Sequence, residues 1–370
     1  MIAKLKADCS LADKAAIIRH IEGQGLRVHV GDSGENPVVS IIGNPTAMLA
    51  DELQRFAGVE SISLDAPSYP LVSLGSRPGP SVVKVGSVFI GGAPIVVVAG
   101  PCSVESAEQL EEVSLGVAAG GAVMLRGGAF KPRTSPYSFQ GMGEDGLKLL
   151  RDAGDRTGLG VVSECVAPED VALMADYVDM LQIGARNMQN FRLLSAVGEQ
   201  PRPVLLKRGL MSTIDEFLLA AEYIMAAGNP RVVMCERGIR SFDTSTRSTL
   251  DISAVPVLKE RTHLPVIVDP SHAAGRRSLV PSLALAGVAA GADGLLIEVH
   301  NNPEVALSDG PQSLTIDGFK ETMDTVSQVA TAIGRSIATL PPLAILPPLA
   351  EGVAPIADRR GGWADPTNAV

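Results

Sequence analysis

Eight short apolar segments of this chain end in residues that can ionise or bind a metal. In chain order, these residues are Cys102, Arg126, Glu164, Arg186, Lys207, Arg237, His272 and Glu298. A single charged residue after an apolar strand is unremarkable, because strand ends meet water. Eight in succession instead indicate that the strand ends converge on one chemical site.

A first subset of these residues has the chemistry of a divalent metal site. It combines a thiol, an imidazole and two carboxylates, from Cys102, His272, Glu298 and Asp309. This mixture of soft and hard ligands suits Mn, Fe, Co or Zn better than Mg or Ca. Each residue also has an ordinary structural explanation on its own; Asp309, for example, precedes Gly310 as a turn residue would. The prediction therefore depends on the convergence of the strand ends.

A second subset is cationic and predicts an anionic substrate. Ten of the 31 basic residues fall at or just after the ends of apolar segments, in a chain of net charge −10. They are Arg126, Lys131, Arg133, Arg186, Lys207, Arg208, Arg237, Arg240, Arg276 and Arg277. Arginine binds carboxylate and phosphate in a bidentate manner, and a local positive field attracts anions. Ion pairs with Glu164, Glu236 and Asp269 are the structural alternative, but they are too few to occupy all ten cations.

The connection at residues 127–146, between an apolar segment and the following helix, is longer than usual. It contains Phe130, Tyr137 and Phe139, and it is stiffened by two prolines. Lys131, Arg133, Thr134 and Ser135 supply charges and hydroxyl donors suited to a phosphate group. A loop of this length in a compact domain is typical of a functional segment.

These residues require a fold that brings strand ends together. From Ile95 onward, eight near-continuous apolar runs alternate with amphipathic helical stretches, as for parallel strands buried on both faces. Eight strand–helix units over about 240 residues predict an α/β fold, a (β/α)8 TIM barrel covering residues 95–337. A doubly wound open sheet is the alternative.

The remaining chain divides into three parts. Residues 1–65 show the strand and helix order βαββαβ, which predicts a small ferredoxin-like domain. Residues 66–94 combine a proline-rich linker with a segment that alternates and turns at Gly86, as a β-hairpin would. Residues 338–370 form a proline-rich extension that cannot be a regular helix, and no function is assigned to it.

Composition excludes several classes of protein. The hydrophobic content of 46% is too high for a disordered chain, and the net charge of −10 argues against a nucleic-acid partner. No apolar run is long enough to span a membrane, and the N-terminal residues do not resemble a secretory signal. Four cysteines without a close pair do not form a disulfide framework. We therefore expect a cytoplasmic protein.

Several motifs resemble one enzyme family. They are GPCSVES, RGGAFKPRTSPYSFQG, QIGARNMQN, LLKRG, CERGIR, DPSHAAGRR and IEVH followed by ALSDGPQSL. In this order, over about residues 95–333, they resemble 3-deoxy-D-arabino-heptulosonate 7-phosphate synthase of the Iβ class. The first 65 residues resemble the ferredoxin-like regulatory domain of some members. The proline-rich tail has no counterpart in this resemblance.

The resemblance implies a reaction and roles for the residues above. The family condenses phosphoenolpyruvate with erythrose 4-phosphate and releases phosphate, as the first step of the shikimate pathway. It implies Cys102, His272, Glu298 and Asp309 as metal ligands. Phosphoenolpyruvate would be held by Arg126, Lys131, Arg186, Lys207 and Arg237. Erythrose 4-phosphate would be held by Arg133, Thr134, Ser135 and Arg276. Lys131 would protonate the nascent alkoxide, and either Glu164 or Asp269 would orient the attacking water.

Two alternatives to this reading stay open. The sibling synthase that uses arabinose 5-phosphate shares the barrel, but it carries a KANRSS-like segment where this chain has KPRTS. A non-catalytic barrel that senses aromatic metabolites is the other alternative. The resemblance further implies a homotetramer and feedback inhibition by an aromatic amino acid, with tyrosine preferred over phenylalanine.

Overall fold

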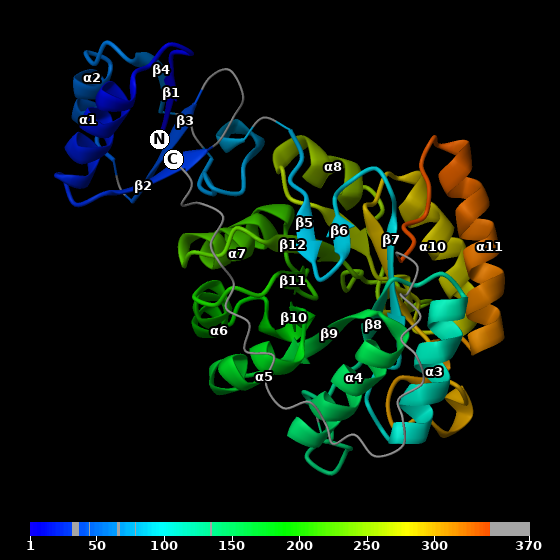
Figure 1. Cartoon of the computed structure of the whole chain (residues 1–370). Helices are drawn as coiled ribbons and strands as arrows, with labels where there is room; N and C mark the ends of the chain where they lie inside the picture. Colours follow the sequence, from blue (N-terminus) through cyan, green and yellow to red (C-terminus); the bar gives the residue numbers. More distant parts are fainter. Residues whose placement is uncertain (32–36, 44, 65–66, 78, 134, 341–370) are drawn as a thin grey trace, which may run out of the picture. The chain divides into compact units, whose positions relative to one another are not determined.

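The computed structural model describes residues 1–31, 37–43, 45–64, 67–77, 79–133 and 135–340, and the two largest sheets of this part of the chain are of different kinds (Figure 1). The first lies within residues 1–63 and has the strand order β2-β3-β1-β4 with antiparallel neighbours. Its elements are β1 (Ile2–Leu5), α1 (Leu11–Glu22), β2 (Arg27–Gly31), β3 (Val38–Ile42), α2 (Ala47–Leu53) and β4 (Val59–Ser63). This βαββαβ order confirms the predicted ferredoxin-like domain.

The second sheet is a closed barrel of eight parallel strands. The strands are β7 (Val96–Gly100), β8 (Met124–Arg126), β9 (Gly160–Cys165), β10 (Met180–Ile183), β11 (Val204–Lys207), β12 (Val232–Glu236), β13 (Val266–Val268) and β14 (Gly294–Glu298). The ring closes where β14 pairs with β7, with Leu295 opposite Val97. The predicted barrel is therefore confirmed, and the open doubly wound sheet is wrong.

Helices connect the barrel strands and surround them (Figure 1). They are α3 (Ala107–Ala119), α4 (Glu144–Thr157), α5 (Val171–Tyr177), α6 (Phe191–Gly198), α7 (Ile214–Ala226), α8 (Ala254–Arg261), α9 (Pro270–Ala274), α10 (Val280–Ala289) and α11 (Ile316–Ala332). Side-chain oxygens cap the first turns of several of them, as where Ser106 accepts from the backbone N–H of Gln109 and Thr213 from that of Glu216. No helix of the described residues is long and apolar enough to cross a membrane.

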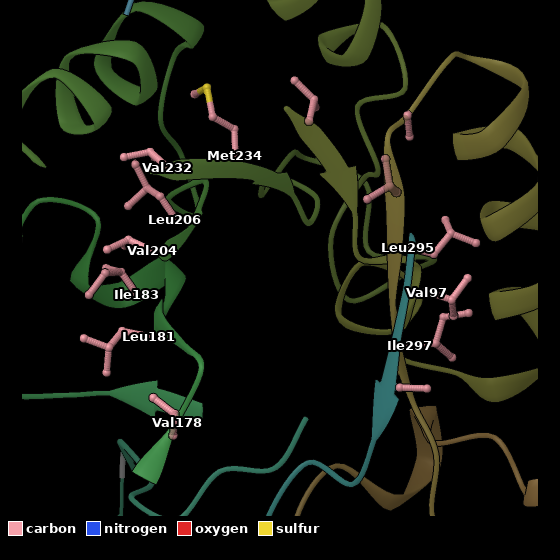
Figure 2. Close-up of a cluster of buried hydrophobic side chains, with 14 of the residues drawn as sticks. Val97, Val178, Leu181, Ile183, Val204, Leu206, Val232, Met234, Leu295 and Ile297 are labelled. Atoms are coloured by element: carbon pink, nitrogen blue, oxygen red, sulfur yellow. The ribbon is translucent and has the colours of Figure 1, made fainter. Parts of the chain in front are cut away.

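One face of each barrel strand packs against the helices. Figure 2 shows Leu181, Ile183, Val204 and Leu206 pointing away from the barrel interior, in a cluster of buried hydrophobic side chains. Residues of the preceding segment join this cluster, because Leu71 and Val72 are buried there. The proline-rich linker thus packs against the barrel over part of its length.

The other face of each strand fills the barrel interior. A predicted hairpin, β5 (Val83–Val85) with β6 (Val88–Ile90), packs its buried valines and Ile90 against interior side chains such as Met124, Val162 and Leu205. Because side chains alternate along a strand, the residue two positions after each interior apolar residue also faces the interior, one layer higher. Those residues are Arg126, Glu164 and Lys207, so the alternation of the strands positions the chemical groups.

Candidate active site

The four predicted metal ligands lie together at the carboxyl ends of the barrel strands. One potential ligand atom from each of Cys102, His272, Glu298 and Asp309 lies within 4.8 Å of the other three. Cys102 follows β7, His272 lies on the short helix α9, and Glu298 ends β14. The Cys102 thiol donates to Asp309 Oδ2 over 3.3 Å. This spacing and donor set fit a single first-row divalent ion.

The imidazole of His272 is oriented toward this cluster by a buried carboxylate. Asp269 Oδ2 lies 2.7 Å from His272 Nδ1, and Asp269 Oδ1 accepts from the His272 backbone N–H over 2.9 Å. The second ring nitrogen, Nε2, lies 3.4 Å from Glu298 Oε1. A carboxylate on the far nitrogen is the usual arrangement around a histidine that binds a metal.

The protonation states of the cluster are suited to cation binding. Burial lowers the pKa of His272 despite Asp269 and Glu298, so its ring is neutral at pH 7. Burial would raise the pKa of Asp309, but His272 and Arg247 hold it well below its usual value. Burial, reinforced by Glu298, raises the pKa of the Cys102 thiol to about 12. A bound cation would be needed to deprotonate this thiol, as metal ions do for coordinating cysteines.

Lys131 lies beside the cluster. Its Nζ donates to the Cys102 carbonyl over 2.8 Å and lies 3.1 Å from the Cys102 sulfur. Burial would lower the pKa of Lys131, but Cys102 and Glu164 raise it above its usual value, so the amine is protonated. Gly128 makes room for this contact, because a Cβ there would lie 2.9 Å from the Lys131 Cδ.

A cavity of about 350 Å³ opens directly above the cluster. Its lining includes His272 and Asp309 of the cluster and Glu164 from β9. Its cationic lining residues are Lys131, Arg133, Arg186, Lys207, Arg237, Arg240 and Arg247. Seven cations around a space of this size make a strong site for a ligand with more than one anionic group.

Three of the expected cations are held by buried carboxylates. Lys207 Nζ donates to Asp269 over 2.6 Å, and Arg126 donates to Glu298 over 2.9 Å. Arg208 donates to Glu236 and to Asp251, both at 2.9 Å, which matches the ion-pair alternative for this residue. Lys207 still lines the cavity, whereas Arg126 and Arg208 do not.

Glu164 and Asp269 differ in their access to the cavity. Asp269 is fully buried, and His272 and Lys207 hold its pKa well below the usual value although burial would raise it. Glu164 lines the cavity, and its carboxylate packs against Gly184, where a Cβ would lie 1.9 Å from Oε1. Any side chain at position 184 would collide with the Glu164 carboxylate, so glycine is required there. Glu164 therefore faces the cavity, whereas Asp269 is enclosed by protein.

The comparisons with known proteins agree with this geometry. Residues 75–335 match the model described as the DAHP synthetase I family, and residues 1–63 match the DAHP synthase ferredoxin-like domain. The chain belongs to the DAHP synthetase I family. The family predicted from the motifs is therefore confirmed, as are the ferredoxin-like domain and the prediction that the chain is an enzyme.

Two curated relatives of this family member are similar to it over different shares of the chain. Phospho-2-dehydro-3-deoxyheptonate aldolase of Thermotoga maritima is 48% identical over 337 residues, covering 91% of this chain and 100% of the relative. 2-Dehydro-3-deoxyphosphooctonate aldolase of Desulfosudis oleivorans is 33% identical over 264 residues, covering 65% of this chain and 92% of the relative. The second similarity has lower identity and covers less of the chain.

Solved structures extend the similarity to three dimensions. The crystal structure of the Thermotoga maritima aldolase, also described as DAHP synthase, has a TM-score of 0.73 at 47% identity and covers 91% of this chain and 99% of its own. A truncated form of 3-deoxy-D-arabino-heptulosonate 7-phosphate synthase from the same organism has a TM-score of 0.69 at 48% identity, covering 73% of this chain and 99% of its own.

Three of the remaining predicted site residues of this family member line two neighbouring cavities. Arg133 and Ser135 line the first cavity, beside Lys131. Arg276 lines a second cavity of about 360 Å³, which shares Arg247 and Asp309 with the first. Thr134 lies outside the described residues.

Two residues beside the cluster, Arg247 and Gln312, were not predicted from the sequence. Arg247 donates to Asp309 Oδ1 over 3.0 Å and to Gln312 Oε1 over 2.7 Å. Gln312 in turn donates to Glu298 over 2.5 Å. Arg247 thus contacts one carboxylate of the cluster directly and the other through Gln312. The position of Gln312, three residues after Asp309, was a usable signal, whereas Arg247 lies eleven residues after the end of β12.

Proposed function

We propose that this enzyme condenses phosphoenolpyruvate with erythrose 4-phosphate and water to give 3-deoxy-D-arabino-heptulosonate 7-phosphate and phosphate. This is the first step of the shikimate pathway to aromatic amino acids. The observation that carries the proposal is the cation-lined cavity directly above the four-ligand cluster, with Lys131 between them. Two anionic reactants and one aldehyde oxygen would require this combination.

The cations would hold phosphoenolpyruvate in a fixed orientation. Lys131, Arg186, Lys207 and Arg237 line one cavity, and their donors suit a carboxylate and a phosphate. Arg126, which the family resemblance adds to this set, is held beneath them by Glu298. Fixed charges at both ends would keep the nucleophilic carbon, C3, in attack geometry and reduce the entropy cost of the encounter.

Erythrose 4-phosphate would place its phosphate near the loop that follows β8. Arg133 and Ser135 support this assignment because they line the same cavity as Lys131. Thr134 and Arg276 complete the proposed set. Arg276 favours the second cavity as the phosphate position, since the two cavities share Arg247 and Asp309.

A divalent ion held by Cys102, His272, Glu298 and Asp309 would supply Lewis-acid polarisation of the aldehyde oxygen. The C2–C3 π electrons of phosphoenolpyruvate form the new C–C bond to the aldehyde carbon. Lys131, protonated and beside the cluster, donates a proton to the oxygen that becomes an alkoxide. Positive charge is left on C2 of phosphoenolpyruvate.

Water then adds to C2 and gives one proton to the carboxylate that orients it. The new C2 hydroxyl becomes the carbonyl as the C2–O bond to phosphate breaks, and its proton leaves with the phosphate. We assign the orientation of this water to Glu164 rather than Asp269. Glu164 lines the cavity, whereas Asp269 is fully buried and occupied by Lys207 and His272. A residue that orients water must reach it within hydrogen-bond distance.

We divide the chain into a ferredoxin-like domain at 1–65, a linker and hairpin at 66–94, a catalytic barrel at 95–337 and an extension at 338–370. The match of residues 1–63 to a domain of this family supports the first of these domains. This domain would make the enzyme sensitive to an aromatic amino acid, with tyrosine the first candidate. We further propose a cytoplasmic homotetramer.

One assay tests the central proposal. Chelated enzyme is mixed with phosphoenolpyruvate and either erythrose 4-phosphate or arabinose 5-phosphate, with and without added Mn²⁺, and phosphate release is followed. We expect turnover only with erythrose 4-phosphate and Mn²⁺, and no recovery in the Cys102→Ala variant. Turnover with arabinose 5-phosphate would make the chain the sibling synthase, and full activity without metal would contradict the metal assignment.

A further inference from the structure

Two carboxylates of the metal cluster are joined by the segment 299–309. Glu298 is fixed at the end of β14, but Asp309 lies on an irregular loop. Asp309 has a φ of 53° and is the only non-glycine residue with positive φ in the described part of the chain. Such a backbone is strained and persists only when its surroundings hold it. The segment therefore needs contacts that fix it.

Glu105 supplies these contacts at two points of the segment. Its Oε1 accepts from the backbone N–H of Leu307 over 2.9 Å and from the Ser103 hydroxyl over 3.2 Å. Its Oε2 lies 3.4 Å from His300 Nε2. His300 is two residues after Glu298, and Leu307 is two residues before Asp309. One side chain thus holds the segment close to both carboxylates.

The partners of Glu105 require a carboxylate rather than an amide. The backbone N–H of Asn302 donates to His300 Nδ1 over 3.0 Å, so a neutral His300 ring carries its proton on Nε2 and donates to Glu105. The backbone N–H of Leu307 is also a donor. Two acceptor oxygens are needed on opposite sides, and a glutamine offers only one.

A third link joins this arrangement to the remaining strand end. Ser103 directly follows Cys102, and its hydroxyl lies 2.6 Å from the hydroxyl of Ser308, which directly precedes Asp309. Both serines are buried, and the Glu105 side chain is only 10% exposed. The contacts therefore reach within two residues of three of the four ligands.

We propose that Glu105 is a positioning residue that fixes segment 299–309 and thereby presents Asp309 to the metal cluster. The inference rests on the proposed function in one respect, that the cluster binds a divalent ion. Glu105 itself touches neither the cluster nor the cavity. Groups hydrogen-bonded directly to metal ligands contribute about 10–100-fold to metal affinity, and we take this range as the scale for Glu105.

The test compares Glu105→Gln and Glu105→Ala with the control Glu112→Gln in the full-length chain. Glu112 is a matched control because it lies on α3, is exposed and accepts from the side chain of Asn301 in the same segment over 2.7 Å. Chelated protein is titrated with Mn²⁺, and free Mn²⁺ is measured by electron paramagnetic resonance. We expect the Kd to rise by about 10–100-fold in both Glu105 variants and to stay within about twofold in the control.

Two further readouts separate positioning from a general loss of structure. Hydrogen exchange in residues 299–309 should accelerate in Glu105→Gln while the barrel strands keep their protection. Excess Mn²⁺ should restore turnover, which it would not do for a misfolded protein. If the isosteric Glu105→Gln variant binds Mn²⁺ like the parent and exchanges segment 299–309 at the same rate, the inference is wrong. If the parent itself binds no Mn²⁺, the proposed metal dependence fails, and the exchange rates alone decide the role of Glu105.

Discussion

Replacement of Glu222 by glutamine should remove a pH dependence of stability that the fold imposes. Glu222 lies on α7 and is 9% exposed. Its Oε2 accepts the backbone N–H of Leu71 over 2.9 Å and that of Val72 over 3.0 Å. Burial raises the pKa of this carboxyl to about 7, and the two backbone N–H groups offset only part of the effect.

The size and the sign of the effect follow from this pKa. The ordinary value of the carboxyl is 4.5, and the folded value is about 7. Because the pKa is raised, the folded state binds more protons than the unfolded state between these values, and stability falls as pH rises through the folded pKa. The loss amounts to about 3 kcal/mol once Glu222 is fully ionised. Glutamine carries no charge, and its single oxygen can replace Oε2 toward both N–H groups.

The assay is denaturant unfolding at about pH 5 and about pH 8.5. The parent and the variant are compared at each pH, so that the titration of all other groups contributes equally to both proteins. We expect Glu222→Gln to gain about 2.5 kcal/mol over the parent between the two conditions, because pH 5 already lies above the ordinary pKa of 4.5. Glu199→Gln, an exposed change at the end of α6, is the control and should show no such gain. If parent and Glu222→Gln lose stability in parallel across this range, the carboxyl titrates at its ordinary pKa and the reasoning is refuted.

Three further predictions concern the proposed function. Arg186→Ala should lower turnover by about 10²–10³-fold in a phosphate-release assay, because one preorganised donor is lost, and removal of Lys207 should have the same effect. An effect below tenfold would exclude Arg186 from the site. Arg133→Ala should raise the KM for erythrose 4-phosphate and leave that for phosphoenolpyruvate unchanged; the reverse pattern would invert the two subsites. Deletion of residues 1–65 should abolish inhibition by tyrosine or phenylalanine, with an expected coupling of about 1–3 kcal/mol, and equal inhibition of both forms would place the effector site elsewhere.

The barrel and the four-ligand cluster were predictable because strand geometry repeats. Each buried parallel strand is a short apolar run in the sequence, and the parallel strands of a barrel have their carboxyl ends on one face. Side chains alternate between the two faces of a strand, so Lys207, two positions after the interior residue Leu205, also faces the barrel interior. The same rule carries Arg126 inward after Met124.

The partners of the charged side chains and the paths of the loops were less predictable, because they depend on contacts between residues far apart in the sequence. The cation list grouped Arg208 with Lys207, although Arg208 turns away from the cavity to Glu236 and Asp251. Arg247 was not predicted because it lies on an irregular segment after β12 and contacts Asp309, which is 62 residues further along the chain. Long-range side-chain contacts of this kind require the folded backbone before they can be identified.

The buried ion pairs explain how an acidic chain maintains a cationic cavity. Lys207 lines the cavity and Arg126 lies outside its lining. Both side chains are no more than 5% exposed, and each donates to a fully buried carboxylate, Asp269 or Glu298. Removing one partner of such a pair typically costs about 3–5 kcal/mol, so the carboxylates hold these cations in place. An ammonium has three donors and Asp269 accepts one of them, which leaves two for a ligand. The carboxylates below the cavity therefore orient the lysine toward an anion instead of competing for it, and the donors need no reorganisation when the substrate arrives.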